Sequence, residues 1–191
     1  AGAVPAAEAP LGDIAVFTME SLKARYDART DRFQHTAETT AQLLRCLKAL
    51  VGPAKAHLAQ QPLLLSLRTD GGRMYAFGDI HGSFPDVVFA HNAAAPLCAP
   101  ELTHPVLFLG DFVDRGSYSV ETVVTLLAFK ILYPKHLFMS RGNHESLGLN
   151  RVYGFEGEVM AKYDVKTFDL FQEVFHGLPL AHLLNQKVFV T

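Results

Sequence analysis

The chain has 191 residues, of which 49% are hydrophobic, and a net charge of −2. This composition is typical of a globular domain that can bury its own core, and it excludes a disordered or fibrous chain. The small negative charge excludes a protein held mainly by nucleic-acid phosphates, and no apolar run is long enough to cross a bilayer. We therefore expect neither nucleic acid nor membrane as a partner.

The first fifteen residues have the composition of a linker. Ala1–Pro10 is rich in alanine and proline and lacks the basic start and leucine-rich core of a signal peptide. We therefore divide the chain into a linker over 1–15 and a domain over 16–191, and we expect a cytoplasmic or nuclear location. Cys46 and Cys98 lack the spacing of a metal-binding pair, which favours buried free thiols in a reducing compartment over a disulfide.

Helical patterns dominate the first third of the chain. Alternating charges among apolar residues predict a solvent-facing helix over Phe17–Arg32. Leucines at helical spacing predict a second helix over 43–51, which we expect Gly52-Pro53 to stop.

From residue 73 onward the pattern changes to strands that alternate with helices. Strands are predicted over Arg73–Phe77, Val106–Leu109 and His136–Met139. A helix is predicted over Val120–Leu132, with Ser119 as its N-cap. This alternation is typical of βαβ units and a largely parallel sheet, so we assign an α/β fold. Further along, we expect a long helix over 158–175 and a last strand over 187–191.

Each of the three strands is followed by a polar cluster. The clusters are Gly78–Gly82, Gly110–Gly116 and Gly142–Glu145. In open α/β sheets ligands bind beyond the carboxyl ends of the strands, so we expect the three clusters to meet at one edge. Taken alone, each cluster is an ordinary strand-end turn. Their conjunction after three successive strands indicates a functional site.

The residue types in these clusters predict a two-metal site. Asp79 and His81 are two residues apart, so in extended backbone they point the same way and can bind one cation. Asp111 can bridge two ions about 3.5–4 Å apart, and Asn143 offers a carbonyl oxygen to the second ion. Oxygen and imidazole ligands without a thiolate suit Mn²⁺, Fe or Zn²⁺, and we favour Mn²⁺.

The remaining residues of the clusters predict hydrolysis of a phosphoester. Two metal ions can bring the pKa of bound water from 15.7 to about 7 and neutralise phosphoryl oxygens. Arg115 can hold two phosphate oxygens, with Asn143 beside it as a second phosphate-binding residue. His144 can protonate the departing oxygen, and Asp114 can fix the tautomer of His144. No covalent nucleophile is required.

The three clusters, in this order and spacing, resemble the signature of the PPP family of serine/threonine protein phosphatases, part of the metallophosphoesterase superfamily. The segments Arg151–Glu158 and Phe175–Leu180 are most similar to the type-5 protein phosphatase branch. The resemblance covers Val16 to Thr191 and is most specific from Arg73 onward. It implies a metallophosphoesterase-type β-sandwich flanked by helices, and removal of phosphate from phosphoserine and phosphothreonine in proteins.

Carried over to this sequence, the resemblance implies the roles assigned above. It implies that the metal ligands are Asp79, His81, Asp111 and Asn143. It implies that the general acid, its partner and the phosphate-binding residue are His144, Asp114 and Arg115.

The sequence departs from the family pattern at two places. Ser83 stands where the family usually has glutamine, which removes no ligand. In the family, the strand that matches Lys187–Thr191 leads into a His-Gly-Gly motif whose histidine binds the second metal. A further ligand histidine, a second phosphate arginine and a tyrosine follow it. None of these occurs here, nor does the helical-repeat domain of the type-5 branch, so we expect a catalytic domain truncated at its C-terminus and inactive alone.

Two other functions stay open from the sequence. A dinucleoside-polyphosphate hydrolase shares related clusters, but Tyr153–Glu158 and the complete Val113–Gly116 run favour a protein phosphatase. A truncated, non-catalytic module of a larger assembly fits the abrupt stop at Thr191, but it would not need the retained ligands. We expect a phosphoprotein substrate and allow for a regulatory or assembly partner.

Overall fold

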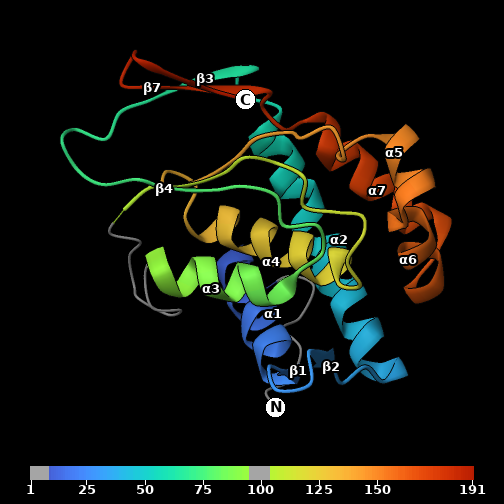
Figure 1. Ribbon diagram of the computed structural model, residues 1–191. Helices are drawn as coiled ribbons and strands as arrows, with labels where there is room; N and C mark the ends of the chain where they lie inside the picture. The colour runs from blue at the N-terminus through green and yellow to red at the C-terminus, as the bar shows by residue number, and fades with distance from the viewer. Residues whose placement is uncertain (1–8, 95–103) are drawn as a thin grey trace.

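The computed structural model describes residues 9–94 and 104–191 and is a mixed α/β structure (Figure 1). Along the chain, its elements are α1 Leu11–Arg25, β1 Tyr26–Asp27, β2 Arg32–Phe33, α2 Ala37–Leu58, β3 Leu64–Leu67, β4 Tyr75–Phe77, α3 Phe84–Ala94, β5 Val106–Phe108, α4 Ser119–Leu132, β6 Leu137–Met139, α5 Leu147–Tyr153, α6 Phe155–Lys162, α7 Val165–His176, β7 Ala181–Leu184 and β8 Val188–Val190. Among these helices, none is both long and apolar enough to span a membrane.

A three-stranded parallel sheet, in the order β4-β5-β6, carries the three polar clusters. Leu107 in the central strand lies opposite Ala76 on one side and Phe138 on the other. All three residues of β5 are buried, which explains why this strand is a continuous apolar run in the sequence. The three strands predicted from residue 73 onward are confirmed, each slightly shorter than expected.

A second sheet, in the order β3-β7-β8, lies at the end of the molecule opposite the β1-β2 hairpin (Figure 1). β3 runs parallel to β7, with Leu64 opposite Ala181, and β7 forms an antiparallel hairpin with β8. Three residues connect the paired Leu184 and Val188, and the first two, Asn185 and Gln186, have left-handed φ angles of 50° and 57°. The predicted last strand is confirmed as β8, whereas β3 and β7 were not predicted.

Helix α4 is the centre of the helical layer and packs against α1, α2, α3 and α6. Its residues from Ser119 to Lys130 are all buried, as expected for a helix that is apolar on every side. The predicted helix is confirmed, but the predicted N-cap is wrong. The carboxylate of Glu158 accepts hydrogen bonds from the backbone N–H groups of Ser119 and Val120 at 3.0 and 2.9 Å.

The boundaries of the N-terminal helices differ from those predicted. α1 begins at Leu11 and buries Ile14 and Ala15 in the core, so the predicted linker over 1–15 is too long. Residues 1–8 of that linker lie outside the described part. α1 also ends at Arg25 instead of Arg32, because the chain there enters the β1-β2 hairpin.

Helix α2 continues through the residues that were expected to stop it. Pro53 lies inside the helix, although proline removes one backbone hydrogen bond there. Ala54 and Leu58, beyond the proline, are 0% and 1% exposed, so burial of this turn outweighs the local preference. Cys46, also in α2, is a buried free thiol as expected, and Cys98 lies outside the described residues.

The long helix predicted over 158–175 is two helices, α6 and α7. Asp164 interrupts it as the N-cap of α7, because its carboxylate accepts hydrogen bonds from the N–H and the hydroxyl of Thr167 at 2.8 and 2.7 Å. The break lets α6 and α7 pack against each other, with Phe155 and Phe171 in edge contact between them.

Candidate metal and phosphate site

The backbone at the carboxyl edge of the β4-β5-β6 sheet is held in unusual conformations. His81, Asp111, Asp114 and Arg115 all have positive φ angles, of 46°, 51°, 70° and 65°. Left-handed backbone is uncommon for residues with a side chain and concentrates at functional sites. Hydrogen bonds from the N–H groups of Ile80 and His81 to the carbonyl of Asp111, at 3.0 and 2.8 Å, join the first two clusters.

Glycine at position 142 is required by the close approach of the second and third clusters. A Cβ atom at Gly142 would overlap the backbone nitrogen and the carboxylate of Asp111. Gly110 packs against Gly142 equally closely, and its own φ is 109°. The glycines of the two sequence motifs therefore bring their polar neighbours into contact.

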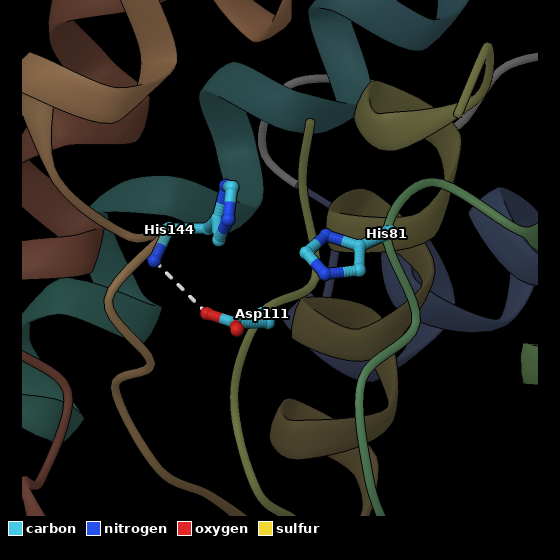
Figure 2. A group of neighbouring side chains, drawn as sticks. All are labelled: His81, Asp111 and His144. Atoms are coloured by element: carbon cyan, nitrogen blue, oxygen red, sulfur yellow. Dashed lines mark hydrogen bonds between the residues drawn. The ribbon is translucent and has the colours of Figure 1, made fainter. Parts of the chain in front are cut away.

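His81, Asp111 and His144 form a group that can hold a metal ion (Figure 2). One ligand atom from each lies within 4.8 Å of the others, and the two imidazole rings are 4.7 Å apart. The backbone N–H of His144 also donates to the carboxylate of Asp111 at 2.9 Å. These three residues come from the loops after β4, β5 and β6, so the clusters do meet at one edge of the sheet.

The environment of His81 fits a metal ligand. Its Nδ1 donates to the carbonyl of Val113 at 2.8 Å, which leaves the lone pair on Nε2. Nε2 is buried and has no hydrogen-bond partner among the described residues. A hydrogen bond from the other ring nitrogen to a carbonyl fixes the tautomer and the ring orientation of metal-binding histidines. A cation bound between Nε2 of His81 and the carboxylate of Asp111 would give this buried nitrogen a partner.

Two further predicted ligands are open to solvent. The carboxylate of Asp79 is 3.7 Å from Nε2 of His81 and is 66% exposed. Asn143, which precedes His144 in the chain, is exposed, and its backbone carbonyl accepts a hydrogen bond from the hydroxyl of Ser146. The structure thus gathers His81, Asp111 and His144 closely, places Asp79 beside His81, and leaves Asn143 exposed.

His144 and Asp114 form a buried pair. Nδ1 of His144 lies 2.8 Å from Oδ2 of Asp114, and the two residues are 3% and 1% exposed. The backbone N–H of Phe155 donates to Oδ1 of the same carboxylate at 2.8 Å. The Asp114 bond places the proton of the neutral ring on Nδ1, and Nε2 faces the exposed Arg115 guanidinium at 3.3 Å.

Glu145 supports the site in a way that the sequence did not reveal. It is fully buried, and its carboxylate accepts hydrogen bonds from the N–H groups of Asp111, Phe112 and Gly142 at 2.8, 2.8 and 2.9 Å. Burial, the largest influence, raises the pKa of Glu145 to about 7. Its carboxylate ties the second strand-end loop to the third.

Comparison with known proteins identifies the family of the chain that carries this site. The calcineurin-like phosphoesterase family matches residues 72–191, which is more than half of the chain. The chain belongs to this family. The matched region contains all three strand-end clusters.

The relatives of this calcineurin-like phosphoesterase are protein phosphatases. Serine/threonine-protein phosphatase T of Trypanosoma brucei brucei is 51% identical over 63% of this chain, and serine/threonine-protein phosphatase 5 of Arabidopsis thaliana is 45% identical over 79%. A solved phosphatase of Saccharomyces cerevisiae, described as similar to human phosphatase 5, superposes with a TM-score of 0.68 at 37% identity over 75% of this chain. The predicted resemblance to serine/threonine protein phosphatases, and most of all to the type-5 branch, is confirmed.

The chain spans only part of each of these proteins. It covers 25% of the length of each of the two sequence relatives and 45% of the solved chain.

The solved neighbour confirms the predicted α/β class. The sequence relatives do not favour the alternative function, hydrolysis of a dinucleoside polyphosphate.

Proposed function

We propose that the protein to which this chain belongs removes phosphate from phosphoserine and phosphothreonine in proteins. The observation that carries the proposal is the meeting of His81, Asp111 and the Asp114–His144 pair at one sheet edge, in a calcineurin-like phosphoesterase. The relatives are named for this activity, which supports a phosphoprotein substrate.

Four residues are proposed to bind the metal ions. Asp79, His81 and Asp111 would hold the first ion, and Asp111 and Asn143 would hold the second. When bound, two divalent ions supply Lewis acidity toward the phosphoryl oxygens and lower the pKa of water. Oxygen and imidazole donors favour Mn²⁺, with Fe and Zn²⁺ as the other candidates.

His144 is proposed as the general acid and Arg115 as the phosphate-binding residue. Because Nδ1 of His144 is bonded to Asp114, only Nε2 can deliver a proton to the departing oxygen. Asp114 holds the ring in position and stabilises its protonated form.

The exposed guanidinium beside Nε2 can hold two oxygens of an incoming phosphate, and the exposed Asn143 is proposed as a second phosphate-binding residue. The buried free thiol of Cys46 supports a reducing compartment, the cytoplasm or the nucleus.

The test uses the full-length protein, loaded with Mn²⁺, and a phosphoserine peptide. We expect release of phosphate, and we expect His81→Ala to lower both the bound Mn²⁺, measured by elemental analysis, and the turnover. His136→Ala, a histidine outside the three clusters, is the control and should change neither. Preferential cleavage of a dinucleoside polyphosphate, or unchanged Mn²⁺ content in His81→Ala, would contradict the proposal.

A further inference from the structure

We infer that Asn150 is a positioning residue for the Asp114–His144 pair, and that Gln172 fixes the orientation of Asn150. The inference rests on the proposed function, in which His144 delivers a proton to the departing oxygen. It adds helices α5 and α7 to a site otherwise built from strand-end loops.

Asn150 contacts both members of the pair with one amide group. Its Nδ2 donates to Oδ2 of Asp114 at 3.0 Å and to the backbone carbonyl of His144 at 2.6 Å. Asp114 belongs to the loop after β5 and His144 to the loop after β6. The amide therefore links the two loops at the point where the side chains of the pair meet.

These contacts determine which way the amide points. Both atoms next to Nδ2 are oxygens that accept hydrogen bonds, so the amide nitrogen must face them and Oδ1 must face away. Oδ1 then accepts a hydrogen bond from Nε2 of Gln172 at 2.8 Å. Gln172 lies in α7, which packs beside α6 and runs near α5 (Figure 1). A rotated amide would lose all three bonds and bring two oxygens face to face.

Burial makes this chain of hydrogen bonds costly to break. Asn150 is 0% exposed and Gln172 is 8% exposed. Asn150 is also the only buried residue of α5, Leu147–Tyr153. A short helix that buries a polar side chain in place of an apolar one contributes little to a hydrophobic core, and a buried amide requires partners. The partners of this amide are the two residues of the Asp114–His144 pair and Gln172.

The backbone and the carboxylate of Asp114 are both held in place by the surrounding structure. Its φ of 70° is uncommon for a residue with a side chain. The N–H of Phe155 donates to Oδ1 and the amide of Asn150 donates to Oδ2. These two hydrogen bonds fix the plane of the carboxylate to which His144 is bonded. The ring of His144 then has one preferred orientation, with Nε2 directed at Arg115.

The experiment compares four variants of the full-length, Mn²⁺-loaded protein on a phosphopeptide. Asn150→Leu keeps the branching at Cγ, with a larger side chain, and removes the amide. Gln172→Met removes the anchor, and Gln172→Glu replaces a donor by an acceptor facing Oδ1 of Asn150. Leu43→Val, at a buried position of α2, is the control: it should lower stability without changing the hydrogen bonds of Asn150 and Gln172. A one-dimensional proton spectrum of the ¹⁵N-histidine-labelled, metal-free protein follows the Nδ1–H of His144 at fixed pH, because paramagnetic Mn²⁺ would broaden this signal.

We expect Asn150→Leu to lower kcat by about 10–100-fold with KM within about twofold, and to broaden or abolish the Nδ1–H signal. Gln172→Met should show a smaller loss of kcat and Gln172→Glu a larger one, while Leu43→Val should leave kcat and the signal unchanged. A merely structural role would lower the melting temperature and leave kcat per folded molecule within about twofold.

An intact Nδ1–H signal in both Asn150→Leu and Gln172→Glu would overturn the inference. If Asn150→Leu does not fold, the order of the two Gln172 variants decides the question. If the wild-type protein releases no phosphate, the proposed function fails. The proton spectrum still tests the positioning role separately, because the His144–Asp114 bond is present without substrate.

Discussion

Replacing Glu158 tests whether a distant carboxylate holds the start of α4 beside the candidate site. Glu158 lies in α6, and its side chain is 10% exposed. It accepts hydrogen bonds from the N–H groups of Ser119 and Val120, and it pairs with Lys162 at 2.8 Å. Ser119 is four residues beyond Arg115, so the capped turn of α4 directly follows the phosphate-binding loop.

The expected loss follows from these contacts. In Glu158→Ala, two N–H groups in the first turn of a buried helix lose a charged acceptor, and Lys162 keeps only Glu121 as its ion-pair partner. Because Lys162 stays paired, the main loss is that of the acceptor for the two N–H groups, about 1–3 kcal/mol. For a domain of this size, about 2–4 °C of melting temperature correspond to 1 kcal/mol, so we expect a drop of roughly 2–12 °C.

A neighbouring ion pair, between α5 and α6, gives the matched control. Glu156 pairs with Arg151 at 3.5 Å, and their side chains are 35% and 59% exposed. Glu156→Ala should cost about 0–1 kcal/mol, as exposed ion pairs do. Glu158→Gln, which keeps the shape and one acceptor oxygen, should fall between the two.

The assay is thermal unfolding of the full-length protein together with hydrogen exchange of the peptide that contains Ser119 and Val120. Glu158→Ala should exchange faster there, and Glu156→Ala should not. Equal melting temperatures for the two alanine variants, or unchanged exchange at the start of α4, would refute the capping argument.

Three further predictions concern the site and the pH range. Replacing His144 by Asn should lower kcat by about 10²–10⁴-fold with normal Mn²⁺ content, and unchanged turnover of a phosphopeptide would remove His144 from the mechanism. Burial lowers the pKa of His182 from 6.5 to about 4. Between these two pH values the unfolded chain binds more protons than the folded chain. The free energy of unfolding should therefore fall by about 3 kcal/mol as the pH is lowered from about 6.5 to about 4. Urea unfolding at pH 7 and pH 4.5 measures this loss, and His182→Gln should reduce it. Among the described residues, Asp111 and Asn143 are the ligands proposed for a second ion, so the 191-residue chain should bind Mn²⁺ but release little phosphate. Turnover equal to that of the full-length protein would contradict this.

The sheet and its polar edge were predictable because their signals are local. β5 is buried on both faces, which produces an unbroken apolar run, and the Gly110–Gly116 cluster follows immediately. Parallel strands place such clusters at one edge, which is why the proximity of His81, Asp111 and His144 could be expected from spacing alone.

The elements that were missed depend on distant partners. β3 pairs with β7, and the register sets Leu64 opposite Ala181 across more than a hundred residues. Short strands of this kind carry too few residues for a periodic signal. Likewise, Ser119 matches a local N-cap pattern, but Glu158 supplies the cap. Packing on the far side of Pro53 outweighed a local stop signal in α2.

The supporting residues of the site were hidden for a related reason. Glu145 and Asn150 are fully buried polar residues whose bonds reach the loops after β5 and β6. A polar residue inside a protein is costly unless it is bonded, so its position on an inward face would mark it as important. The sequence does not show which face of α5 is inward, because this helix has no apolar stripe to orient it. Only when α7 is placed next to α5 does Gln172 meet Asn150, and the site then includes residues that no motif contains.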